Sequence, residues 1–116
     1  MNILIFCKPS LNLIFKEKWC IDKEKGTIQN NSNGLYLLRV GVPPGASMIA
    51  LKAKETDGSG WQFNKIKGNQ YWIVSKKESS VKKVLSVYFD EGLNDYHFTS
   101  ATFDQNDISQ VWNLKL

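Results

Sequence analysis

Turn-forming residues recur about every 8–12 residues along this chain, the spacing typical of short strands in β-sandwiches and barrels. Clear examples are Asn33-Gly34, Lys67-Gly68-Asn69 and Asp90-Glu91-Gly92. No segment has a helical period, and residues 16–25 hold at most one turn of helix. We therefore expect an all-β fold, an antiparallel β-sandwich of jelly-roll or immunoglobulin-like type with about 8–10 short strands. Its length of 116 residues predicts a single domain spanning residues 1–116.

The expected strands are short apolar or alternating runs between these turns. They occupy residues 3–7, 11–15, 35–40, 46–54, 61–66, 70–74, 84–89, 96–103 and 111–116. Residues 3–7 and 11–15 are expected to form a hairpin about Lys8-Pro9-Ser10. Residues 23–34 form a polar loop in this prediction. The run 84–89 is apolar on both faces, which predicts a central strand.

The charge of the chain argues against nucleic acid as a partner. The net charge is +4, and only one of the 15 cations is an arginine, Arg39. Nucleic-acid binding usually shows a denser basic stripe, rich in arginine. No apolar run reaches the ~18 residues of a membrane span, and the apolar start lacks the basic region and cleavage site of a signal peptide. We expect no membrane association and a cytoplasmic location in the producing cell.

The two cysteines, Cys7 and Cys20, both lie in apolar surroundings. Our preferred interpretation is two small buried side chains in a reducing compartment. The alternative is a disulfide that closes the intervening loop.

Residue types that carry chemistry are scarce. His97 is the single histidine and the two cysteines lie in apolar surroundings, which argues against a zinc site of the usual ligand set, and no nucleophile motif accompanies His97. The acidic pairs Asp90-Glu91 and Asp104/Asp107 are expected to form turns or caps. We predict that the protein is not an enzyme and uses no cofactor or metal.

Charge is segregated near the C-terminal third of the sequence. No Lys or Arg occurs between Val84 and Leu114, and a basic group precedes this stretch: Lys76, Lys77, Lys82 and Lys83. The interpretation that we favour is two solvated loops of opposite sign. The functional alternative is a subunit whose basic patch meets the acidic patch of a neighbour, which would steer association.

Several aromatic side chains are candidate binding residues. Adjacent Tyr71 and Trp72 must point to opposite faces of one strand, so at least one is expected to be exposed. An exposed Trp61 or Trp72 beside Asp57, Asn64 or Asn69 would stack on a sugar ring. This arrangement gives the alternative function, a carbohydrate-binding module. Most of these rings are nevertheless expected in the core.

Three segments carry a resemblance to a group of proteins. They are "NILIFCKPSLNLIFKEKW" (2–19), with Ile3, Ile5, Leu13, Ile14 and Phe15, then "GVPPGASM" (41–48) and "LSVYFDEG" (85–92). The chain resembles small β proteins encoded in the tail-gene regions of phages and prophages. The resemblance implies a β-sandwich in phage particles, without catalytic residues to carry over. Our first functional prediction is thus a non-enzymatic structural or assembly protein that self-associates or binds a protein partner, with virion association as an extension.

Overall fold

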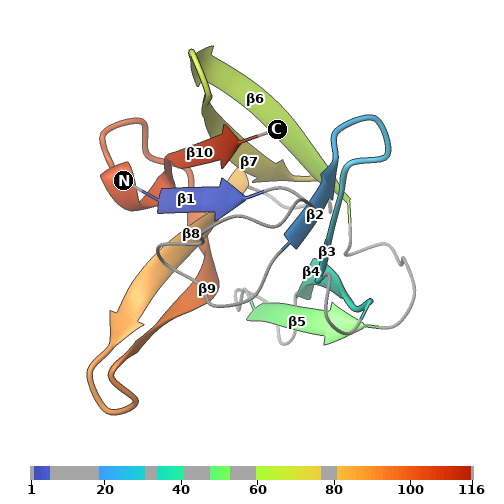
Figure 1. Ribbon diagram of the computed structural model, residues 1–116. Coiled ribbons are helices and arrows are strands. Elements are labelled where there is room, and N and C mark those ends of the chain that lie inside the picture. Colours follow the sequence, from blue (N-terminus) through green and yellow to red (C-terminus); the bar gives the residue numbers. More distant parts are fainter. Residues whose placement is uncertain are drawn as a thin grey trace.

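Two β-sheets packed face to face make up the fold (Figure 1). The computed structural model describes residues 2–5, 19–30, 34–40, 48–52, 60–76 and 81–115. Within these ranges the chain forms ten strands and one turn of 3-10 helix. The prediction of an all-β sandwich with about 8–10 short strands is confirmed.

The larger sheet has six strands and the smaller has four. The six-stranded sheet contains β1 (Asn2–Ile5), β6 (Trp61–Lys67), β7 (Gln70–Ser75), β8 (Lys83–Asp90), β9 (Asp95–Thr102) and β10 (Trp112–Lys115). The four-stranded sheet runs in the order β2 (Trp19–Asp22), β3 (Thr27–Asn30), β4 (Tyr36–Val40) and β5 (Met48–Lys52). The helix η1 spans Ile108–Gln110. One pair departs from the expected antiparallel pattern, because β1 runs parallel to β10.

Strand β7 organises the larger sheet because three strands pair with it. β6 pairs along its whole length, from Trp61 opposite Ser75 to Lys67 opposite Gln70. A strand has only two edges, so the opposite edge is divided between β10, which pairs with Tyr71, and β8, which pairs at Val74. β8 lies between β7 and β9, as predicted for a central strand.

The hairpin β2–β3 was not predicted. Residues 16–25 were expected to hold at most a turn of helix, and residues 23–34 a loop, because charged residues outnumber apolar ones there. In the structure, β2 and β3 pair antiparallel from Trp19 opposite Asn30 to Asp22 opposite Thr27. Asp22 Oδ1 accepts the backbone N–H groups of the turn, and Gly26 ends it with φ 72°, a value that favours glycine.

Other turn and hairpin predictions have mixed outcomes. Gly34 lies between β3 and β4, where the turn was expected, and Gly68 lies in the predicted turn between β6 and β7. Residues 11–15 of the first predicted hairpin lie outside the described residues. The described pairing of β1 is with β10.

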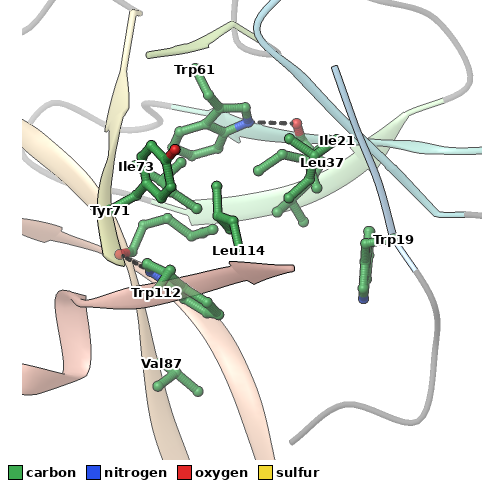
Figure 2. Close-up of a cluster of buried hydrophobic side chains, with 11 residues drawn as sticks. Trp19, Ile21, Leu37, Trp61, Tyr71, Ile73, Val87, Trp112 and Leu114 are labelled. Carbon is green, nitrogen blue, oxygen red and sulfur yellow. Dashed lines mark hydrogen bonds between the residues drawn. The ribbon is translucent and has the colours of Figure 1, made fainter. Parts of the chain in front are cut away.

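The core lies between the two sheets and is built around three tryptophans (Figure 2). The four-stranded sheet contributes Trp19, Ile21, Ile28 and Leu37, and the six-stranded sheet contributes Trp61, Tyr71, Ile73, Leu85, Val87, Trp112 and Leu114. A buried indole N–H usually finds a hydrogen-bond partner, and two of these three tryptophans have one, whereas Trp19 Nε1 has none. Trp61 Nε1 donates to the Leu37 carbonyl oxygen at 3.0 Å, and Trp112 Nε1 donates to that of Leu85 at 2.9 Å.

The preferred interpretation of the cysteines was wrong. Cys20, on β2, is disulfide-bonded. Cys7 is the only other cysteine of the chain, and it lies outside the described residues. Apolar surroundings could not separate the two alternatives, because a disulfide is itself an apolar group that suits such surroundings.

Candidate binding surface

Trp61 is not a surface residue. Its relative exposure is 0% and its ring belongs to the core. Its indole N–H already donates a hydrogen bond to the Leu37 carbonyl oxygen. The proposal of Trp61 as a sugar-stacking platform is therefore wrong. The sequence showed a tryptophan directly after a Gly-rich turn, but it could not show that the second sheet covers that end of β6.

Tyr71 and Trp72 point to opposite faces of β7, as predicted. Tyr71 belongs to the core, and its hydroxyl accepts a hydrogen bond from Lys23 Nζ at 3.2 Å. The same ammonium lies 5.0 Å from the centroid of the Tyr71 ring. Tyr71 is thus occupied by contacts within the chain and offers little surface to a ligand.

Trp72 lies on the outer face of the larger sheet, opposite Asn64 of β6 in the strand register. Its ring packs edge-on against Phe103, with the centroids 4.8 Å apart. The indole Nε1 is buried and has no hydrogen-bond partner. Of the predicted sugar-binding set, these two residues come together, although Phe103 covers part of the tryptophan ring.

The predicted basic group is divided by the structure. Lys82 Nζ lies over the Phe103 ring at 4.3 Å, and Lys83 Nζ donates to Thr102 Oγ1 at 3.0 Å. Lys76 is exposed and its side chain runs beside Gly60 toward Gly26. Lys77 and Asp57 lie outside the described residues. Only Lys82 and Lys83 are therefore shown together, at the start of β8.

The segment after β9 covers the middle of β8 on its outer face. Asp107 caps η1 by accepting hydrogen bonds from the Ser109 N–H at 2.9 Å and from its hydroxyl group. Ser86 Oγ donates to the Ser109 carbonyl oxygen at 3.2 Å, which fixes η1 against β8. The prediction that the acidic residues here form caps or turns is confirmed for Asp107.

The exposed large apolar side chains of the described residues fall in one stretch of the sequence. All five large hydrophobic side chains that are exposed among the described residues lie between positions 81 and 108. They are Val81 (45%), Tyr88 (48%), Phe89 (45%), Leu93 (68%) and Ile108 (75%). Sequence reasoning missed them as a group, because Tyr88 and Phe89 continue the buried run of β8. Ile108, an apolar residue inside the polar stretch 104–110, was the available signal.

We call β8, β9 and the turn between them (residues 83–102) the arm. In Figure 1 the arm projects beyond the other strands of the larger sheet, and its tip lies at the opposite end of the molecule from the turn between β6 and β7. At the tip, Tyr88 is directly opposite His97, and their rings are 5.7 Å apart. Asp90 Oδ1 accepts the Leu93 N–H, which closes the turn.

Charge changes sign along the arm. The basic residues Lys82 and Lys83 are at the base of the arm, and Lys82 lies over the Phe103 ring. Asp104, which follows Phe103 in the chain, is the acidic residue nearest to this ring in the sequence. The tip carries Asp90, Glu91 and Asp95, and Asp90 pairs with Asp95 across the strands. An eight-residue strand separates base from tip, a span of about 25 Å. The outer surface of the arm thus has Lys82 at one end, exposed Tyr88 and Ile108 between the ends, and Asp90 at the other end.

The described residues offer no group of three or more His, Cys, Asp or Glu side chains able to hold a metal ion. His97 Nε2 is buried and makes no hydrogen bond. In the part of the chain that the structure describes, no helix is long and apolar enough to cross a membrane. Comparisons with protein-family models, with curated proteins and with solved structures find no match for this chain.

Proposed function

We propose that this protein is a non-enzymatic assembly protein that self-associates through the outer surface of the arm and η1. The observation that carries the proposal is that Tyr88, on the outer face of β8, and Ile108, on the helix that packs against this face, are both exposed large hydrophobic side chains. Exposed apolar residues scattered singly need no explanation, but a group of them rimmed by charge is typical of protein-binding surfaces.

The residue types at this surface suit a protein interface. Tyrosine and phenylalanine supply large contact areas at low cost in side-chain entropy, and aromatic residues are enriched in interface cores. Tyr88 is held on a paired strand, so association through it would order few additional groups, whereas Phe89 follows it on the opposite face of β8. Asp90 and Lys82 give a polar rim of both signs, which favours orientation and specificity.

The carbohydrate-binding alternative has less support. Trp61 is fully buried, and Trp72 is partly covered by Phe103. A sugar-binding platform needs an accessible ring face beside polar side chains, and only the pair Trp72 and Asn64 remains for that role. No described contact favours a sugar over a protein there.

Under this proposal, the assembly belongs to a phage or prophage particle. The support is the resemblance noted above, whose third segment (85–92) contains Tyr88 and Phe89 on the arm. Particle proteins make repeated contacts between copies, and an exposed apolar arm suits that requirement. Detection of the protein in purified particles by mass spectrometry would test this extension.

The experiment is light scattering on a sizing column over a range of protein concentrations. We expect a defined oligomer that Ile108→Ser and Leu93→Ser weaken, because both side chains are more than two-thirds exposed and contribute little to the core. Lys67→Ser, an exposed change on β6, is the control and should leave the oligomer unchanged. A protein that is monomeric at every concentration contradicts the proposal.

A further inference from the structure

We infer that the partner of the arm is the arm of a second copy, packed antiparallel about a two-fold axis. This inference rests on the proposed function and specifies its geometry. In such a dimer, the basic base of each arm faces the acidic tip of the other. The surface is then self-complementary, as a two-fold interface requires.

The order of side chains along the outer face carries the argument. Lys82 is at the base, Ile108 is over the middle of β8, and Tyr88 and Asp90 are near the tip. Reversing this series sets Lys82 against Asp90 of the second copy and apolar residues against apolar residues. A parallel arrangement would place like charges together at both ends, which is unfavourable in an interface.

These residues share one face of the sheet. Val87 and Leu85 point into the core, so the alternate residues Ser86, Tyr88 and Asp90 point outward. Lys82 Nζ lies over Phe103, which packs on the outward-facing Trp72. Helix η1 binds Ser86 on the same face. The stripe is thus continuous from the base of the arm to its tip.

The tip of the arm is acidic in sequence. Asp90 and Asp95 occupy the last cross-strand pair, Glu91 follows directly, and no Lys or Arg occurs between Val84 and Leu114. Like charges placed directly opposite destabilise a hairpin. A cation from a second copy would offset this charge, and Lys82 is exposed at the base of the outer face to supply it.

The test exchanges charges at the two ends. The base variant is Lys82→Glu with Lys83→Glu, and the tip variant is Glu91→Lys with Asp95→Lys, which keeps Asp90 as the acceptor for the turn. The control is Lys65→Glu with Lys67→Glu on β6. Each Lys→Glu change removes two units of charge, so base variant and control both fall from a net charge of +4 to zero. The oligomeric state of wild type, both variants and the control is measured by light scattering and native mass spectrometry at equal protein concentrations.

We expect wild type and control to form a dimer of twice the 13.2 kDa chain mass. The base variant and the tip variant should each dissociate at least about tenfold more readily, yet a 1:1 mixture of them should form a heterodimer. The heterodimer would also show that both variants are folded.

Three results would overturn the inference. If both charge variants dimerise like the control, the antiparallel charge pairing is wrong while the proposed self-association stands. If the mixture forms a series of species larger than a dimer, the contact is head-to-tail and not two-fold. If wild type is monomeric at every concentration, the inference and the proposed function both fail.

Discussion

Trp61 on β6 and Leu37 on β4 join the two sheets through one hydrogen bond, from the indole N–H to the backbone carbonyl oxygen at 3.0 Å. Both side chains are buried, and the bond crosses the centre of the sandwich (Figure 2). The contact combines the burial of a large ring with the satisfaction of two polar groups that would otherwise lie in an apolar core.

We predict that Trp61→Phe destabilises the protein by about 2–3 kcal/mol, because it removes the donor and part of the ring volume together. Urea unfolding followed by circular dichroism measures the effect. Trp72→Phe is the matched control: the Trp72 Nε1 makes no hydrogen bond, so we expect a smaller loss. Equal losses for the two variants would contradict the role given to the Trp61 bond.

The turn between β2 and β3 depends on Gly26. Its φ is 72°, and a Cβ there would collide with the Trp61 backbone oxygen. Gly68 has a φ of 53°, but a Cβ there would meet no atom within 4 Å. We predict that Gly68→Ala costs about 1 kcal/mol for the backbone alone, and that Gly26→Ala costs at least about 1 kcal/mol more. Thermal unfolding of both variants tests the difference, and equal costs would show that the collision is relieved without penalty.

The state of the cysteines is directly measurable. Because Cys20 is disulfide-bonded, we expect no free thiol in the unfolded, unreduced protein and two after reduction. Closing a loop between positions 7 and 20 would stabilise the fold by roughly 3 kcal/mol, and reduction should remove that contribution. Thiol titration and unfolding with and without reductant measure both effects. Two titratable thiols before reduction would contradict the disulfide.

Self-association should weaken with salt. Lys82 is exposed, and exposed ion pairs are screened at high ionic strength. Raising NaCl from about 0.05 M to about 0.5 M should increase the dimer dissociation constant by about threefold to tenfold, measured by sedimentation. An oligomer that strengthens with salt would instead show that the apolar residues alone drive association, since salt strengthens apolar burial.

The sequence predicted strands well where apolar runs stood between clear turns. Strands β7 and β8 were located to within a residue or two, and the opposite directions of Tyr71 and Trp72 followed from strand geometry. It failed at β2 and β3, because four-residue strands among charged residues carry almost no periodic signal.

The candidate surface was harder to predict than the fold. Alternation along a strand separates two faces, but it does not tell where the opposing layer ends. Trp61 was therefore kept as a candidate binding residue although the second sheet covers it, and the run 84–89 was expected to be central although Phe89, at its end, is exposed. The separate contacts of the predicted basic group could not be foreseen for a similar reason. Lys82 lies over Phe103 and Lys83 donates to Thr102, and both partners are distant from the lysines in sequence.

The parallel pairing of β1 with β10 has a consequence for biosynthesis. More than a hundred residues separate these strands, and β10 also supplies the contact between β1 and β7. On the ribosome, β1 must wait on the order of ten seconds for its partner to be made. The larger sheet is thus completed only after synthesis of β10, and the edge of β1 is open to chaperones, or to aggregation, throughout that delay.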